Sequence, residues 1–270
     1  DSRALGTQAE SHPNLVALDA DLMLDCGLIP FRDKFPDRFI ECGIAEQDMV
    51  SMAGGLALRD MLPVAHSFAC FLSTRPNEHF YTNATEKKKI IYVGSLAGLL
   101  PGGPGHSHQS VRDISILSAI PDLMLIEPCT ESEVEMAMDY AVNTSQTSVY
   151  IRLVSIPCEV PFSLPQDYQM AAGKGVAVTE GDDAVMFAYG PVMLAEAVKA
   201  ANLLKKEYDL GLRVVNLPWL NDVDNDWLRS TVVGVRFIFT LDDHFLKGGQ
   251  GEMLACRLAE INEISGYQLQ

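Results

Sequence analysis

Short apolar runs recur along the first half of the sequence, and stretches with helical spacing separate them. Several of these runs have the length and composition of buried strands, and two of them end in a charged residue, Asp19 and Arg152. The predicted strands cover residues 15–19, 39–40, 61–65, 90–94 and 148–152. Helical spacing follows over residues 44–58 and again after a capping-box pattern at Thr130 and Glu133. This alternation is typical of an α/β fold with a parallel sheet.

A second alternation of strands and helices begins after a stretch that is rich in proline. We predict strands at 184–188, 212–216 and 237–241, and helices at 191–206 and 251–260. The sequence therefore predicts two doubly wound domains. Their expected boundaries are residues 1–154, a linker at 155–174, and residues 175–270.

Composition excludes several classes of protein. With 270 residues, 48% of them hydrophobic, the chain can bury a large core, and its formal net charge of −16 argues against binding to nucleic acid or an anionic membrane. The six cysteines form no Cys-x-x-Cys pair, so we expect free thiols in a reducing compartment, the cytoplasm. The sequence has no apolar run of about twenty residues and no signal-peptide pattern.

The stretch from Asp37 to Val50 carries the strongest chemical signal. Gly43 permits a sharp turn after a strand, and Glu46 then falls in the first turn of the predicted helix. An isolated glutamate there is usually an ordinary charge that favours the helix dipole. Here the neighbours are apolar or small, which predicts a helix that is buried on most sides. A buried carboxylate needs a specific partner.

Gly43-Ile44-Ala45-Glu46-Gln47, followed by Ala53-Gly54-Gly55-Leu56-Ala57, resembles the signature of the pyrimidine-binding domain of transketolase-like enzymes that depend on thiamine diphosphate. The resemblance implies that Glu46 hydrogen-bonds the aminopyrimidine of this cofactor and so activates it. It also implies that Ile44 lies against the cofactor.

Phe68 and Phe71 are three residues apart, at the start of a predicted helix, and share one of its faces. By default such a pair belongs to the core. The resemblance implies instead that Phe71 stacks on the pyrimidine ring, while for Phe68 both the core and the cofactor contact stay open. His66 and Arg75 flank the same helix start, so we expect both to face the site, His66 as a proton carrier and Arg75 toward substrate. An arginine exposed on the surface is the alternative for Arg75.

The segment from Leu99 to Ser110 is rich in glycine and proline and holds His106 and His108, which is typical of a functional loop. Either histidine alone would ordinarily be a surface residue. The segment resembles the family's Gly-Pro-Thr-His-Gln loop, and a gapless match places His108 on the histidine that hydrogen-bonds the donor carbonyl. His106 or His66 would then assist in proton transfer.

The substrate side departs from the family pattern. Arg3 and Arg152 match arginines that bind the anionic end of the substrate, although a strand-end arginine such as Arg152 is more often ion-paired or on the surface. Asp25 stands where a phosphate-binding serine is expected, and Leu96 and Pro104 replace a histidine and an acid. We therefore expect the cofactor half of the site to be kept and the sugar-phosphate half to be rebuilt.

The sequence does not supply the family's magnesium motif, Gly-Asp-Gly with a later asparagine. Gly181-Asp182-Asp183 is the nearest approach, and it has the pattern of a turn. The resemblance thus implies that a separate diphosphate-binding, α-type subunit holds Mg²⁺ and the diphosphate, in an α2β2 heterotetramer. Glycines 248, 249 and 251 lack a dinucleotide-binding spacing and are expected to serve tight packing.

The main hypothesis is a β-type subunit of a two-component, thiamine-diphosphate-dependent transketolase-like transferase. It would move a two-carbon ketol or acyl unit from a small ketose or 2-oxo acid. One alternative is the E1 β subunit of a 2-oxoacid dehydrogenase-type complex, or acyl transfer in specialised biosynthesis. A second is a non-catalytic scaffold, against which the joint presence of Glu46, Phe71 and His108 argues.

Overall fold

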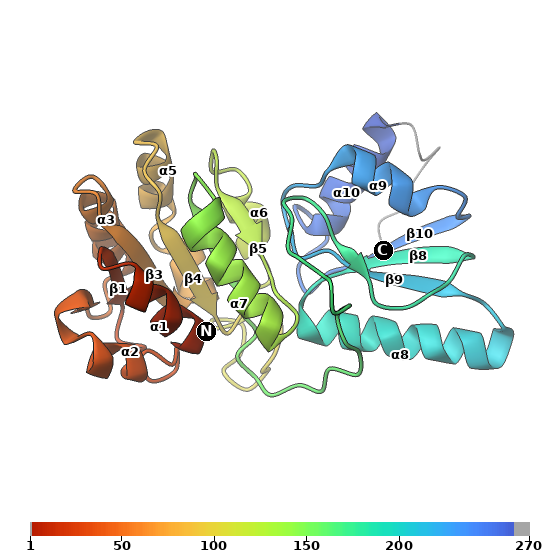
Figure 1. Ribbon diagram of the computed structural model, residues 1–270, viewed down its shortest axis with the longest axis horizontal. Helices are drawn as coiled ribbons and strands as arrows, with labels where there is room; N and C mark the ends of the chain where they lie inside the picture. Colours follow the sequence, from red (N-terminus) through yellow and green to blue (C-terminus); the bar gives the residue numbers. More distant parts are fainter. Residues whose placement is uncertain (1, 262–270) are drawn as a thin grey trace.

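The protein consists of two α/β units that lie side by side (Figure 1). The computed structural model describes residues 2–261. Residues 1 and 262–270, which the predicted domains include, lie outside the described residues. An irregular segment links the last strand of the first unit, which ends at Arg152, to the first strand of the second, which begins at Val176. The α/β fold class is confirmed.

The first sheet has six strands in the order β2-β1-β3-β4-β6-β5, and every neighbouring pair is parallel. Its strands are β1 (Leu15–Asp19), β2 (Phe39–Glu41), β3 (Leu62–Phe68), β4 (Ile91–Ser95), β5 (Met124–Ile126) and β6 (Val149–Arg152). An all-parallel sheet must be covered on both faces, which explains why its central strands are continuously apolar.

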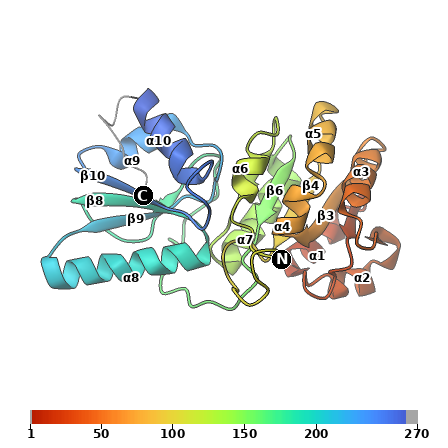
Figure 2. The same ribbon diagram turned by 180° about the vertical axis from the view of Figure 1, so that it is seen from behind.

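Helices cover both faces of this sheet (Figures 1 and 2). On one face lie α1 (Ser2–Ser11), α2 (Ile29–Lys34) and α7 (Glu131–Asp139), and on the other α3 (Glu46–Ala57), α4 (Ala69–Thr74), α5 (Asn77–Thr85) and α6 (Asp113–Leu117). A 3-10 turn, η1 (Pro36–Arg38), precedes β2, and a π-helical turn, η2 (Tyr140–Thr144), follows α7. Alternate residues of β1 pack into different apolar clusters: Leu15 and Ala17 into one, and Val16 and Leu18 into the other.

The second sheet has the order β10-β8-β9-β7, and only β7 runs antiparallel to its neighbour. Its strands are β7 (Val176–Ala177), β8 (Ala184–Ala188), β9 (Leu212–Asn216) and β10 (Phe237–Leu241). Helix α8 (Gly190–Tyr208) covers one face, and α9 (Asn225–Val232) and α10 (Gln250–Glu260) cover the other (Figure 1). The structure reproduces the predicted bounds of β8, β9 and β10.

The two units share an apolar core around Trp219. Its side chain is completely buried, its backbone forms a β-bridge with Ile126 of β5, and its ring centroid lies 5.0 Å from that of Tyr140. The indole N–H donates to the carbonyl of Lys174 at 2.9 Å. These contacts fix the second unit beside the β5 edge of the first sheet.

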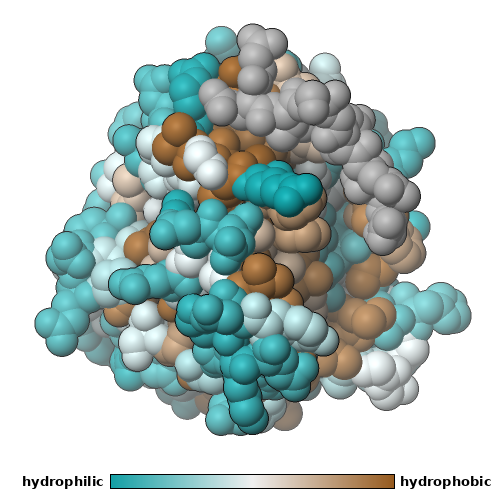
Figure 3. Space-filling model, turned by 90° about the vertical axis from the view of Figure 1, so that its right-hand side faces the viewer, coloured by the Kyte–Doolittle hydropathy of each residue, from teal (hydrophilic) through white to brown (hydrophobic). Residues whose placement is uncertain are grey.

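The end of the molecule formed by the second unit is a mosaic of hydrophilic side chains with smaller hydrophobic areas between them (Figure 3). On the edge strand β10, Phe237 and Phe239 remain about half exposed, at 51% and 48%. None of the helices within residues 2–261 is both long enough and apolar enough to cross a membrane.

Candidate active site

The candidate site lies where the strand order of the first sheet changes direction. The chain leaves β1 toward β2 on one side and returns to β3 on the other. In open parallel sheets, ligands bind at this point, outside the carboxyl ends of the strands. Glu46 begins the helix that follows β2, and Phe68 ends β3, so both lie at this edge.

Glu46 is held in place by the turn before α3. Gly43 adopts a φ of 66°, a left-handed conformation that favours glycine, and its N–H donates to Glu41 Oε1 at 2.8 Å. The helix then begins at Glu46, whose residue is only 2% exposed. Arg75 Nη1 donates to Glu46 Oε1 at 2.5 Å, and the same guanidinium lies 3.9 Å from the centroid of the Phe71 ring. The buried carboxylate therefore has a charged partner.

Two phenylalanine rings and one imidazole form a cluster beside this pair. The ring centroid of His108 lies 5.1 Å from that of Phe71 and 6.1 Å from that of Phe68, and the two phenylalanines are 5.9 Å apart. All three side chains are only partly buried. Through Arg75 the cluster adjoins Glu46, so the structure brings together a buried carboxylate, accessible aromatic rings and an imidazole.

The loop that carries His108 is closed at its base. Gly98 and Ser110 exchange two backbone hydrogen bonds, of 3.1 and 3.0 Å. Within the loop, Ser107 Oγ lies 3.0 Å from His108 Nδ1, and His106 is exposed to solvent. Of the two loop histidines, the structure therefore places only His108 against the phenylalanines.

The expected role of His66 needs correction. It lies inside β3, which extends three residues beyond the predicted strand, and it is completely buried. Burial lowers the pKa of His66 to about 3, so the imidazole stays uncharged at neutral pH. With no exposed surface on its side chain, His66 packs as a core residue of β3.

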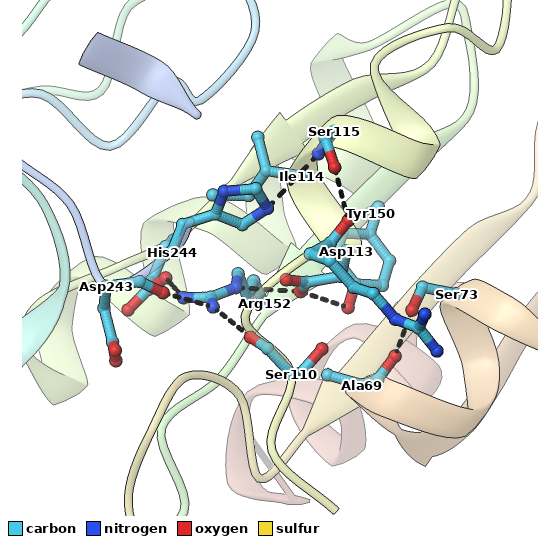
Figure 4. Close-up of polar contacts among 12 residues, drawn as sticks. Ala69, Ser73, Ser110, Asp113, Ile114, Ser115, Tyr150, Arg152, Asp243 and His244 are labelled. Carbon is cyan, nitrogen blue, oxygen red and sulfur yellow. Dashed lines mark hydrogen bonds and ion pairs between the residues drawn. The ribbon is translucent and has the colours of Figure 1, made fainter. Parts of the chain in front are cut away.

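The expected substrate contact of Arg152 is also wrong for this structure. Its side chain is completely buried at the end of β6, where Nε donates to Asp113 at 2.8 Å (Figure 4). Its Nη1 pairs with Glu127. Its Nη2 donates to the carbonyls of Ser110 and Asp243 at 2.7 and 2.9 Å. All these partners of the guanidinium belong to the protein itself. They are far apart in the sequence, so no sequence pattern indicated that they would meet Arg152.

The remaining predicted residues lie in different places. Arg3, on α1, pairs with Glu131 and Glu135 of α7 at 3.6 and 2.7 Å and lines a cavity of about 480 Å³ between these helices, so it does not join the Glu46 cluster. Asp25 is exposed. Ile44 lies two residues before Glu46 in sequence and is 73% exposed.

Asp19 is a second buried carboxyl group at the same edge of the sheet. Its Oδ2 accepts the Leu22 N–H at 2.6 Å, and no hydrogen-bond partner is found for Oδ1 among residues 2–261. Burial raises the pKa of Asp19 to about 7, and the neighbouring Glu41 carboxylate acts in the same direction. The sequence did hold a signal for it, since Asp19 ends an apolar strand at the carboxyl edge.

The Gly181-Asp182-Asp183 segment forms a turn before β8. Asp183 accepts the Gly211 N–H at 2.6 Å, and Asp182 pairs with Arg213 at 2.8 Å. Across the described part of the chain, the structure contains no group of three or more His, Cys, Asp or Glu side chains that could hold a metal ion.

Comparison with known families identifies the chain. Residues 2–155 match the family described as the transketolase pyrimidine binding domain, and residues 173–270 match the transketolase C-terminal domain. The protein therefore belongs to the transketolase family, in agreement with the resemblance found in its sequence.

Two relatives illustrate the similarity. It is 31% identical over 251 residues to a Methanocaldococcus jannaschii protein provisionally named a transketolase C-terminal section, covering 91% of this chain and 76% of that protein. It is 30% identical to the 1-deoxy-D-xylulose-5-phosphate synthase of Clostridium perfringens, covering 95% of this chain but only 40% of the synthase.

The fold is also similar to that of a solved split-gene transketolase, described as an inactive β4 tetramer. The two structures superimpose with a TM-score of 0.84 at 28% sequence identity. The match covers 96% of this chain and 83% of that one.

Proposed function

We propose that the protein is the β-type subunit of a two-component transketolase-like enzyme that depends on thiamine diphosphate and transfers a two-carbon ketol or acyl unit. The observation that carries this proposal is the buried carboxylate of Glu46 beside the rings of Phe71 and His108, at the carboxyl edge of the parallel sheet. Relatives that include a transketolase section and a 1-deoxy-D-xylulose-5-phosphate synthase support it.

The residues present suit the cofactor's aminopyrimidine ring. A flat ring that is polar at its edge can pack on the partly exposed faces of Phe68 and Phe71, while Glu46 hydrogen-bonds its edge. When bound, thiamine diphosphate supplies an electron sink for making and breaking carbon–carbon bonds. Glu46 would share a proton with the ring, and His108 would exchange one with the substrate's carbonyl oxygen. Arg75 orients the Glu46 carboxylate.

A separate α-type subunit completes the site in this proposal. It holds Mg²⁺ and the diphosphate, and the assembly is an α2β2 heterotetramer in the cytoplasm. Within this chain, residues 1–154 are the pyrimidine-binding domain, 155–174 the linker and 175–270 the C-terminal domain. The structural relative described as an inactive β4 tetramer supports the expectation that this chain alone assembles without activity.

A donor without a phosphate group, such as a 2-oxo acid, is the second candidate. Leu96 and Pro104 present apolar side chains where the family has polar ones, and Asp25 adds an exposed negative charge. Each missing charge-assisted hydrogen bond would cost about 1.5–3 kcal/mol of phosphate binding. This pattern leaves room for acyl transfer of the kind catalysed by an E1 β subunit as the alternative to transfer from a ketose.

Calorimetry of thiamine diphosphate with Mg²⁺ tests the proposal. The titration uses this chain alone and this chain after co-purification with the product of a neighbouring reading frame for a diphosphate-binding domain. We expect binding only by the pair, followed by turnover of a ketose or 2-oxo acid donor. Tight Mg²⁺-dependent binding by this chain alone would contradict the two-component arrangement. A stable pair that binds no cofactor would favour a non-catalytic scaffold.

A further inference from the structure

The loop that carries His108 is anchored from the second unit. The segment from Asp243 to Phe245 follows β10 of that unit and is bonded to both ends of the loop. Figure 4 shows the end at Ser110, which Arg152 joins to Asp243. Glycines and prolines make up much of the loop between Gly98 and Ser110. Such a loop has a large conformational entropy when free, so external contacts determine where its histidine lies.

The carboxylate of Asp243 holds the first end of the loop. Its Oδ1 accepts the N–H of Leu99 at 3.0 Å. Its Oδ2 occupies the space beside Gly98: a Cβ atom on that residue would lie 1.8 Å away. Gly98 also has a φ of 85°, so glycine is required there for conformation as well as for close approach. Asp243 is 7% exposed, which shields this contact from water.

Arg152 connects the other end of the loop to the same segment. Its Nη2 donates both to the carbonyl of Ser110, the last loop residue, and to the carbonyl of Asp243. Asp113 and Glu127 fix the rest of the guanidinium. One buried side chain of the first unit thus ties its own loop to the backbone of the second unit (Figure 4).

Two further contacts extend this junction. The Phe245 N–H donates to the carbonyl of Val111 at 2.8 Å, directly after the loop. The Ser115 N–H, near the start of α6, lies 3.4 Å from His244 Nε2. The second unit therefore contacts the chain at both ends of the loop. Within this loop, His108 contacts Phe68 and Phe71.

We propose that Asp243 is a positioning residue of the active site: through its hydrogen bond to Leu99 and its contact with Gly98, it sets the place of His108 against Phe71. The C-terminal domain then contributes to the geometry of the reaction as well as to assembly. The catalytic part of this inference rests on the proposed function, whereas the structural part does not.

The structural part is tested in the whole 270-residue chain with three variants. Asp243→Ala removes the acceptor, and Asp243→Asn keeps an oxygen for the Leu99 N–H. Asp224→Ala is the matched control, because Asp224 Oδ1 also accepts a backbone N–H in the second unit, that of Trp227 at 2.7 Å, at the start of α9. Each variant is first checked for folding by circular dichroism.

The readouts are amide hydrogen exchange in the loop and the NMR signals of the His108 ring in histidine-labelled protein, assigned with His108→Gln. In Asp243→Ala we expect exchange of the Leu99 amide about tenfold faster, from the loss of one hydrogen bond, and a shift of the His108 ring signals as the phenylalanine ring currents are lost. Asp243→Asn should retain most of the protection, and Asp224→Ala should leave both readouts unchanged.

The catalytic part is tested in the complex with the diphosphate-binding subunit. Asp243→Ala should lower kcat about tenfold to a hundredfold with an unchanged Kd for thiamine diphosphate, because the misplaced group is the histidine and not the cofactor contact. Asp243→Asn should restore most of kcat.

Unchanged His108 signals and Leu99 exchange in Asp243→Ala would overturn the inference whatever the activity. If the loop readouts change as expected but no pair of subunits shows cofactor-dependent turnover, the positioning of the loop stands and the proposed function fails. Equal losses of kcat in Asp243→Ala and Asp224→Ala would show that general destabilisation causes the loss, and this result would also overturn the inference.

Discussion

Arg75 Nη1 lies 2.5 Å from Glu46 Oε1, and this ion pair joins the start of α3 to the end of α4. The two side chains differ in environment: that of Glu46 is 3% exposed and that of Arg75 is 39% exposed. The arginine therefore reaches from the surface to a carboxylate that water hardly contacts. Arg75 also covers Phe71, so one residue organises both the acid and the aromatic part of the candidate site.

Replacing Arg75 by methionine should destabilise the isolated chain by about 1–3 kcal/mol, because it leaves the buried Glu46 charge without its partner. Urea denaturation measures this change. Arg59→Met, at an exposed arginine after α3, is the control and should stay within about 0.5 kcal/mol of the parent. The double variant Glu46→Gln/Arg75→Met should recover part of the loss. If its change in the free energy of unfolding equals the sum of the changes in Glu46→Gln and Arg75→Met, the ion pair contributes nothing to stability.

Substitution of the buried Arg152 should lower the free energy of unfolding more than substitution of Arg75. Arg152→Met removes the partner of Asp113 and Glu127, and we expect a loss of about 3–5 kcal/mol in the free energy of unfolding. Arg257→Met breaks an exposed pair with Glu260 and should cost less than about 1 kcal/mol. Similar losses for the two variants, measured by denaturant titration, would contradict the structural role of Arg152.

Asp19 should make stability depend on pH. Burial raises its pKa from 3.8 to about 7, so the folded protein binds this proton more tightly than the unfolded chain. Its contribution is therefore fully present below about pH 4 and is lost as the pH rises to about 7. Asp19→Asn, which cannot ionise, should remove this slope and stabilise the protein at pH 8 by roughly 2–4 kcal/mol relative to the parent.

Unfolding titrations at several values between pH 5 and pH 8 measure the effect of Asp19→Asn. Asp21→Asn, at an exposed neighbouring position, is the control and should keep the parental slope. An unchanged slope in Asp19→Asn would show that the buried carboxyl group does not take up the proton.

Two adjacent glycines of α3 should respond in opposite directions to alanine. A Cβ atom on Gly54 would lie 2.1 Å from Asn83 Oδ1, and Asn83 is held by a hydrogen bond to the Val50 carbonyl. Gly54→Ala should therefore cost about 1–3 kcal/mol. Nothing lies within 4 Å of a Cβ on Gly55, so Gly55→Ala should stabilise the helix by about 0.5–1 kcal/mol. Thermal unfolding compares the melting temperatures of the two variants. Equal shifts in melting temperature would contradict the packing of α3 on α5.

Much of the fold could be predicted from the sequence because its parallel strands are buried and continuously apolar. The bounds of β8, β9 and β10 agree with the predicted ranges, and Thr130 caps α7 through the Glu133 N–H. Strand β3 was predicted to end too early, since His66 and Ser67 are polar residues within a buried strand. The two-residue strand β7 is too short to produce a pattern.

The sequence motif could predict which residues form the candidate site. It could not predict which charged residues pair with one another. Glu46, Phe71 and His108 lie together as the resemblance implied, while their catalytic roles stay predictions. The partners of Arg152 are distant in sequence and meet only through the fold, so the strand-end position suggested an accessible arginine. The same holds for Asp243, whose contact with the loop depends on the docking of the second unit.

The most direct test of the central claim is cofactor-dependent turnover by the paired subunits with Glu46→Ala. The control is Glu78→Ala, at an exposed glutamate in the first turn of α5, just as Glu46 lies in the first turn of α3. Our account predicts that Glu46→Ala reduces turnover to background while Glu78→Ala keeps the parental rate. Parental turnover by Glu46→Ala would contradict the assignment of this carboxylate as the group that activates the cofactor.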